Sequence, residues 1–198
     1  MRWFWIDQFT EFVSGQSAIA VKNVSLAEEH LLDHFDGYPV MPTSLVIEGM
    51  AQTAGLLASQ IHDFEELVVL AKVGKARFEG HARPGETLTY RATIQQSHPD
   101  GTMVSVTSHL SKRMNGGKRM HGDERMHGTI ELFFAHLDKE DEKGGPVRRL
   151  FEPKDLLRWL RVLGVFDVGR HPDGSKLEIP PNLAATDLAP STSDSSTP

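Results

Sequence analysis

The sequence contains no cysteine among its 198 residues. This absence excludes disulfides, zinc sites built on thiolates and cysteine nucleophiles. It also fits a reducing compartment, and we expect a cytoplasmic protein. Positive charge is in deficit, with 21 Lys and Arg against 27 Asp and Glu, which gives a net charge of −6. The chain therefore lacks the basic field that would attract nucleic acid or an acidic membrane.

Long apolar runs are also missing. The best candidate for a membrane span, around residues 43–61, is interrupted by Glu48, Gln52 and Gln60. The N-terminal MRWFWIDQF lacks a basic segment followed by a sustained apolar one, so we predict no signal peptide. A hydrophobic content of 39% and a charged content of 24% are typical of a globular protein. We expect one domain, without a nucleic-acid partner and without stable membrane insertion.

The periodicity predicts a strand, a short helix, a long helix and then four strands. Residues 17–24 alternate between apolar and polar positions, and Ser25 and Glu28 have the spacing of a capping box for a helix at about 25–33. Residues 43–60 carry apolar or small side chains on every face, which indicates a helix buried all round. The later strands are predicted at 67–80, 87–97, 102–112 and 129–136. This order favours an α+β domain over 1–137, with an antiparallel sheet wrapped around one long central helix.

The C-terminal part differs in composition. Residues 138–151 resemble a charged linker, and 152–164 predict an amphipathic helix with Pro153 near its start and Gly164 at its end. Beyond about 170 the chain is rich in Pro, Ser, Thr and Asp, so we expect 165–198 to be a disordered and dispensable tail. The expected architecture is thus one domain with a C-terminal helical extension.

A repeat occupies residues 113–128, where Arg-Met-(Asn/His)-Gly occurs three times. It suggests an elongated turn on which His121 and His127 share a face. Two histidines without a carboxylate or third ligand make a weak metal site, so a polar hairpin tip is favoured and we predict no metal. The histidines without a motif are assigned surface or structural roles: His30, His62, His81, His98, His109, His136 and His171.

Glu48 stands alone in the apolar long helix. A buried carboxylate is costly unless it is hydrogen-bonded, and burial should raise its pKa. Gln52, one turn later, can hold the carboxylate in one orientation. Such a glutamate suits proton transfer near neutral pH. Without further context, a structural role is favoured, in which Glu48 caps a buried backbone group or pairs with a distant arginine.

The stretch HFDGYPVMPTSLVIEGMAQ, residues 34–52, resembles the signature of bacterial 3-hydroxyacyl-acyl-carrier-protein dehydratases of the FabZ type. The family pattern is His-Phe-x-Gly-x-Pro-Val-x-Pro-Gly, then Leu, then Glu-Ala-Met-Ala-Gln. The resemblance extends to AIAVKNVS before it and AKVGKARFEGHARPGETL after it, and covers about residues 15–136. It implies the hotdog fold, in which an antiparallel sheet curls around a long central helix.

The resemblance also implies the chemistry. His34 matches the histidine that removes a proton from C2 of the (3R)-3-hydroxyacyl thioester. Glu48 matches the acid that protonates the departing C3 hydroxyl to give the trans-2-enoyl thioester; the FabA type has Asp there. Backbone amides near Thr43 and Ser44 would bind the thioester oxygen. In the family the two catalytic residues that meet come from different subunits, which implies a homodimer and possibly a trimer of dimers.

Three residues depart from the family pattern. Thr43 replaces a glycine and narrows the space beside the thioester. Asp36 replaces a proline and, if close to His34, would raise the pKa of that histidine or orient its ring. Gly49 replaces an alanine and can let another backbone approach the helix.

The implied partner is acyl carrier protein in fatty-acid or related acyl-chain biosynthesis, and no cofactor is expected because 4′-phosphopantetheine arrives on the carrier. Carrier proteins are acidic, so Lys72, Lys75 and Arg77 are candidate contacts, although ordinary solvated strand charges explain them as well. The arginines of the extension could serve the same purpose: Arg148, Arg149, Arg158 and Arg161.

Two other functions fit the same fold. A hotdog acyl-thioesterase or an enoyl-CoA hydratase would use the carboxylate on a water molecule. A non-catalytic acyl-binding hotdog subunit would need neither His34 nor Glu48, so the presence of both at the family spacing argues against it.

Overall fold

The computed structural model describes residues 4–32, 34–112, 124–137 and 152–187. The predicted linker at 138–151, with Arg148 and Arg149, lies outside the described residues. So do most of the repeat, with His121, and the last residues, 188–198.

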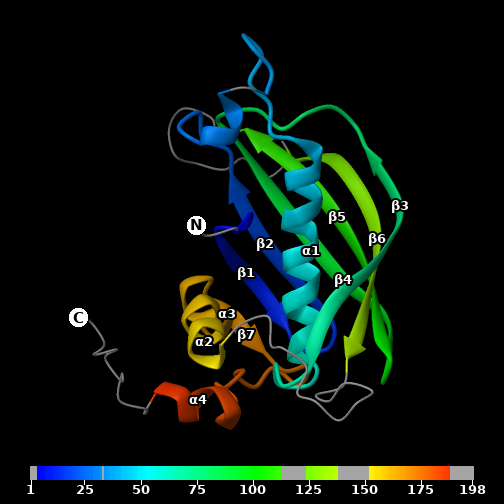
Figure 1. The fold of residues 1–198 in the computed structure, drawn as a ribbon, viewed down its shortest axis with the longest axis vertical. Helices are drawn as coiled ribbons and strands as arrows, with labels where there is room; N and C mark the ends of the chain where they lie inside the picture. Colours follow the sequence, from blue (N-terminus) through cyan, green and yellow to red (C-terminus); the bar gives the residue numbers. More distant parts are fainter. Residues whose placement is uncertain (1–3, 33, 113–123, 138–151, 188–198) are drawn as a thin grey trace, which may run out of the picture.

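A seven-stranded sheet forms the body of the molecule, in the order β3-β6-β5-β4-β2-β1-β7 (Figure 1). Neighbouring strands pair antiparallel, except that the short β7 pairs parallel with β1. The sheet is therefore mixed rather than purely antiparallel. The strands are β1 Gln8–Val13, β2 Ser17–Asn23, β3 Leu67–Phe78, β4 Glu86–His98, β5 Gly101–Lys112, β6 Arg125–Leu137 and β7 Gly169–Arg170.

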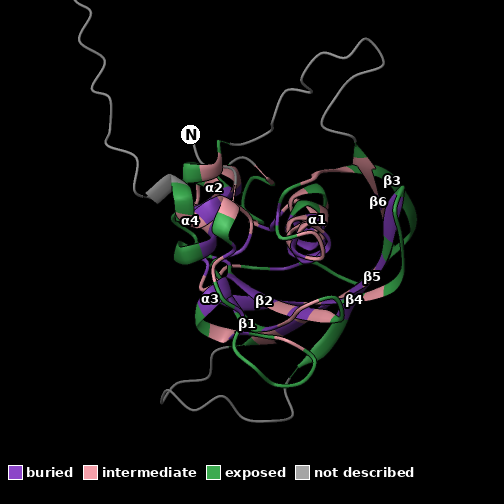
Figure 2. Ribbon diagram, turned by 90° about the horizontal axis from the view of Figure 1, so that it is seen from below, coloured by how far each residue is buried: buried purple, intermediate pink, exposed green. Residues whose placement is uncertain are grey.

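One long helix, α1 (Thr43–Gln60), lies in the hollow of this sheet. It contacts β2, β3, β4, β5 and β6, and Figure 2 shows the sheet curving around it. Val46, Met50 and Leu57 are fully buried on the side that meets the strands. The expected α+β hotdog arrangement is confirmed.

The prediction that α1 is buried all round is wrong for the single chain. Ser44 and Glu48, one turn apart and therefore on one face, are exposed. Small and apolar residues on every side of a helix cannot distinguish burial by the same chain from burial by a partner.

The predicted short helix is reduced to a 3₁₀ turn, η1 (Glu29–Leu31). One half of the predicted capping box forms, since the Ser25 backbone N–H donates to the Glu28 carboxylate at 3.0 Å, whereas the Ser25 hydroxyl accepts from the Ala27 N–H at 3.3 Å. The turn does not extend because only Leu31 is buried, whereas Leu26 and Leu32 are exposed. A short helix without a buried apolar face has little to stabilise it.

The C-terminal extension is folded through residue 187, which corrects the prediction of a disordered tail from 165. The predicted helix appears as α2 (Pro153–Val162), with Pro153 in its first turn and Gly164 in a left-handed conformation just after its end. Two shorter helices follow, α3 (Val165–Val168) and α4 (Pro181–Asp187). A few well-placed apolar side chains anchor this segment, and they are buried in the main core: Val165, Phe166, Leu177 and Leu183.

The extension packs beside β1 and the end of α1 (Figures 1 and 2). The Phe9 backbone N–H donates to the Leu163 carbonyl at 2.8 Å, which extends β1 towards α2. The ring centroids of Phe4 and Trp159 lie 4.6 Å apart. From α4, the Asn182 side chain donates to the Asp63 carbonyl at 3.0 Å, in the turn that follows α1. Among the described residues, no helix is long and apolar enough to cross a membrane.

Candidate active site

The loop between η1 and α1 carries His34 at its base. The Val40 backbone N–H donates to the His34 carbonyl at 2.9 Å, while Phe35 and Tyr38 exchange two backbone hydrogen bonds. Gly37, at φ 68°, makes the turn inside this small hairpin possible. The His34 ring is half-buried and stacks on the Phe35 ring, with centroids 4.3 Å apart. The loop thus holds the His34 imidazole at its base, beside the segment that leads into α1.

A second histidine, His30, lies near His34. Burial lowers the pKa of His30; Glu28 opposes this shift, whereas the positive charge of Lys22 and of a protonated His34 reinforces it. His30 is therefore neutral at neutral pH. Its ring packs edge-on against the Trp5 indole at 5.0 Å. The site thus places a neutral imidazole beside His34.

Gln52 orients the carboxylate of Glu48, as the sequence predicts. The Gln52 side-chain amide donates to Glu48 Oε1 at 3.0 Å. Gln52 Oε1 in turn accepts the backbone N–H of Trp5 at 2.8 Å. Because the Trp5 N–H can only donate, it fixes which end of the amide faces Glu48. The carboxylate is therefore held in position while remaining exposed in the single chain.

Gly49, the residue after Glu48, allows a close approach to α1. A Cβ at this position would lie 2.7 Å from the Trp5 carbonyl oxygen and 2.7 Å from the Tyr90 ring and hydroxyl. These distances are too short for any side chain, so the family's alanine does not fit here. The expected close approach of another backbone is confirmed, and Trp5 supplies it.

The start of α1 offers backbone donors. Pro42 caps the helix without a side-chain hydrogen bond, and the first turn contains no acidic residue. The Leu45 and Val46 amides bond to the Pro42 carbonyl. Within the described parts of the chain, the Thr43 and Ser44 amides have no hydrogen-bond acceptor. Together with the positive end of the helix dipole, they suit an oxyanion or carbonyl oxygen.

Within one chain, the described residues show no hydrogen bond or ion pair between His34 and Glu48. Thr43, Ser44, Glu48 and Gln52 all lie on α1, whereas His34 lies on the loop before it. The structure therefore joins Glu48 to Gln52 by a hydrogen bond, and among the described residues none joins His34 to Glu48. Asp36 is exposed, and no ion pair joins it to His34 in the described chain.

The basic residues of β3 are exposed, as a role in carrier contact requires. Lys72 pairs with Phe133 of β6, and the register then shifts between Val73 and Ala76. Because Lys75 lies in this irregularity, simple alternation cannot assign its face. Arg77 forms an exposed ion pair with Glu79 at 3.3 Å.

Sequence reasoning missed a pair beside the His34 loop. The Arg83 guanidinium lies over the Tyr38 ring, 4.5 Å from its centroid, and donates to the Tyr38 hydroxyl. Tyr38 falls inside the quoted motif, but nothing in the sequence connects it with a residue 45 positions later. The pair fastens the loop to the segment before β4.

Comparison with known proteins matches residues 3–115 to the FabA-like domain. The chain belongs to the FabA-like domain family. This FabA-like domain is 46% identical over 77 residues to a 3-hydroxyacyl-[acyl-carrier-protein] dehydratase FabZ of Petrotoga mobilis, covering 39% of this chain and 55% of that protein. It is 33% identical over 110 residues to the enzyme of the same name from Ruminiclostridium cellulolyticum, covering 55% of this chain and 78% of that protein.

The matched part of the FabA-like domain spans between about half and two thirds of several such relatives, for example 55% of the Petrotoga protein and 65% of the Campylobacter fetus protein.

Among solved structures, a thioesterase family protein from Silicibacter pomeroyi superposes with a TM-score of 0.51 at 16% identity, over 66% of this chain and 83% of that one. At that identity the likeness shows the fold alone, which is the hotdog fold.

Proposed function

We propose that the protein dehydrates (3R)-3-hydroxyacyl-[acyl-carrier-protein] to trans-2-enoyl-[acyl-carrier-protein] in fatty-acid or related acyl-chain biosynthesis. One observation carries the proposal. Glu48 is held in a defined orientation by Gln52, yet it stays on the face of α1 that the single chain leaves uncovered. A carboxylate fixed in this way and accessible from outside is poised for a substrate. The matches to FabZ dehydratases support this assignment.

The proposed chemistry uses two proton transfers. The imidazole of His34 removes a proton from C2, and the electron pair forms the C2–C3 double bond as the C3–O bond breaks. The Glu48 carboxylic acid gives its proton to the departing hydroxyl, which leaves as water. The amides of Thr43 and Ser44 stabilise the negative charge that develops on the thioester oxygen. The proton on His34 then returns to Glu48 through solvent, which restores both groups.

Because no hydrogen bond or ion pair joins His34 to Glu48 within the described residues of one chain, we propose that a second copy of the chain completes the site. The edge strand β3 offers a surface for it, since an edge of 12 residues presents unpaired backbone groups and carries the exposed side chains of Leu70 and Val73. The uncovered face of α1 adjoins this region of the fold (Figure 2). A homodimer would cover both surfaces, and further assembly into trimers of dimers remains part of the proposal.

Acyl carrier protein is the proposed partner, with the reaction taking place in the cytoplasm. The exposed Lys72, Lys75 and Arg77 are proposed to attract its acidic surface. The protein itself requires no cofactor in this scheme, because the phosphopantetheine thioester is part of the substrate.

A water-addition assay tests the function. Purified protein is mixed with crotonyl-carrier protein, and enoyl absorbance and free thiol are followed together. We expect absorbance to fall without thiol release, and the fall to disappear in His34→Ala. Thiol release would instead identify a thioesterase. Silence on both channels across several chain lengths would contradict enzymatic function and favour an acyl-binding subunit.

Mixing two inactive variants tests whether the site is shared between subunits. His34→Ala and Glu48→Gln are each expected to be inactive alone. After unfolding and refolding together, half of the dimers contain one copy of each variant, and one of their two sites has both catalytic groups. Activity should therefore recover to about one quarter of wild type. If each site lay within one chain, the refolded mixture would stay inactive.

A further inference from the structure

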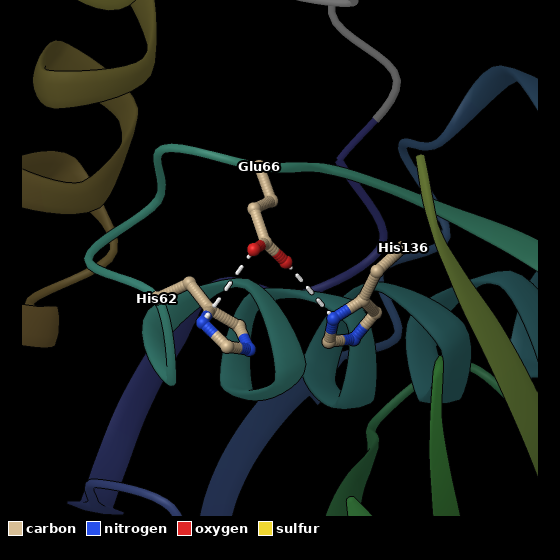
Figure 3. A group of neighbouring side chains, drawn as sticks. All are labelled: His62, Glu66 and His136. Atoms are coloured by element: carbon tan, nitrogen blue, oxygen red, sulfur yellow. Dashed lines mark ion pairs between the residues drawn. The ribbon is translucent and has the colours of Figure 1, made fainter. Parts of the chain in front are cut away.

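Three side chains that the proposed reaction does not use converge at the far end of α1. His62 lies in the turn that follows the helix, Glu66 immediately precedes β3, and His136 is near the end of β6 (Figure 3). His62 Nδ1 is 3.6 Å from Glu66 Oε1, and His136 Nδ1 is 3.0 Å from Glu66 Oε2. One ligand atom from each residue lies within 4.8 Å of the others. Sequence reasoning treated His62 and His136 as unrelated.

Two of the atoms that face the centre of this cluster make no hydrogen bond, although both histidines lie within ion-pair distance of Glu66. The His136 side chain is only 2% exposed. Its Nδ1 and the nearby Glu66 Oε2 are both buried and make no hydrogen bond, in spite of their 3.0 Å separation. Buried polar atoms without a partner are rare and costly. Nδ1 of a nearly fully buried imidazole thus lies within ion-pair distance of a carboxylate oxygen but makes no hydrogen bond to it.

The other nitrogen of His136 indicates which atom is free to act as a ligand. Nε2 lies 3.0 Å from the hydroxyl of Thr102, which lies 3.2 Å from the Ser97 hydroxyl. If Nε2–H donates to Thr102, the Thr102 hydroxyl can donate to Ser97, and all three groups are satisfied. Nδ1 then presents a lone pair towards Glu66, and two electron-rich atoms face each other. A metal-binding histidine commonly donates its second ring nitrogen to a fixed acceptor in this way.

We propose that His62, Glu66 and His136 bind a divalent transition-metal ion, for which Zn²⁺ is the best match. Two imidazoles and one carboxylate suit zinc, and water can fill the fourth position. Donors bound to one zinc ion at about 2.0–2.1 Å lie about 3.3–3.4 Å apart in a tetrahedral arrangement. The 3.0 Å between His136 Nδ1 and Glu66 Oε2 is close to that value, while His62 Nδ1 lies 3.6 Å from the other carboxylate oxygen, Oε1. One ligand atom from each of the three residues lies within 4.8 Å of the others, so small side-chain rotations would close the set around one ion. Mg²⁺ and Ca²⁺ prefer oxygen ligands and fit this set poorly.

The ion would fasten α1, β3 and β6 to one another. Val68 of β3 pairs with His136, so the ion would hold the first residues of the edge strand. Glu48 and His62 are 14 positions apart, which is about 21 Å along a helix. The site is therefore structural and remote from the proposed reaction, and either proposal can fail without the other.

Zinc titration of the full chain after EDTA treatment and dialysis tests this site. Calorimetry of wild type should give one Zn²⁺ per chain, with Mg²⁺ binding at least about 100-fold more weakly. Glu66→Gln and His62→Ala should each weaken zinc binding by at least about tenfold. The same two variants should lose the rise in melting temperature that zinc gives wild type. His62 is partly exposed, so its variant should fold even if other replacements do not.

His98→Ala is the matched control, because His98 is an exposed histidine at the end of β4. It should bind zinc like wild type. Equal affinity in His62→Ala, Glu66→Gln and His98→Ala would overturn the proposal, as would the absence of zinc binding by wild type. Replacement by Co²⁺ adds a visible spectrum that should be present in wild type and His98→Ala and absent in His62→Ala.

Discussion

Glu48→Gln is expected to lower the rate of dehydration by roughly 10²–10⁴-fold, the usual contribution of a positioned general acid. Glutamine has nearly the shape of glutamate but carries no proton that it can give to a leaving hydroxyl. Its side-chain oxygen can still accept the hydrogen bond from Gln52, so the local geometry is kept. Because the exchange keeps the shape of the side chain and its hydrogen bond with Gln52, the free energy of unfolding should change by no more than about 0.5 kcal/mol.

The measurement is kcat/KM for a 3-hydroxyacyl-carrier protein, with thermal unfolding of each variant recorded in parallel. Glu11→Gln serves as the control, since Glu11 is an exposed carboxylate on β1. It should retain the wild-type rate and melting temperature. A Glu48→Gln enzyme that turns over within a few-fold of wild type would remove Glu48 from the mechanism.

Deleting residues 165–198 is expected to prevent stable folding. The deletion removes four side chains that are at most 7% exposed: Val165, Phe166, Leu177 and Leu183. Burial of one such side chain contributes about 1.5–3 kcal/mol, so the four together contribute about 6–12 kcal/mol. A domain is typically stable by only about 5–15 kcal/mol. The loss of β7 also leaves β1 as an unprotected edge.

Circular dichroism during heating, combined with size-exclusion chromatography, measures this effect. The chain that ends at Gly164 should aggregate or unfold without a cooperative transition. A chain that ends at Asp187 is the control, because it retains every contact described above. If the chain ending at Gly164 melted like the control, the extension would contribute little to the core.

The central fold could be predicted because its signals are local. The strands from β2 to β6 and the long helix follow from alternation, from turns and from the apolar run at 43–60. β1 was missed because its register shifts between Phe9 and Glu11. Its buried residues Phe9 and Phe12 are therefore three positions apart, and a strand with an extra residue has no simple alternation.

The composition of the extension does not predict that it folds. The Ser- and Thr-rich end lowered the hydrophobicity of the whole segment, although a few residues such as Phe166 and Leu177 are enough to dock it. A sequence shows how many apolar residues a segment has, but not whether they converge on one surface.

For the candidate site, the quoted motif identified His34, Glu48 and Gln52 directly, and the contact between Glu48 and Gln52 is confirmed. The sequence could not predict that Glu48 is exposed in the single chain. A helix that its own chain buries and a helix that a partner subunit buries have the same pattern of apolar residues. The sequence also could not predict the cluster of His62, Glu66 and His136, because only the pairing of β6 with β3 brings His136 to the other two.

The hydrogen bond from the Trp5 backbone to Gln52 has a consequence for evolution and for protein engineering. Its donor is a peptide group, so the amide at position 5 can be supplied by any amino acid except proline. The amino acids found at this position in related proteins would reflect only the packing of the indole ring. They would not reveal the hydrogen bond that the main chain donates. Libraries that randomise side chains near the site would overlook it as well. An affinity tag that shifts the first few residues, in contrast, can displace the Glu48 carboxylate without changing a single residue of the motif.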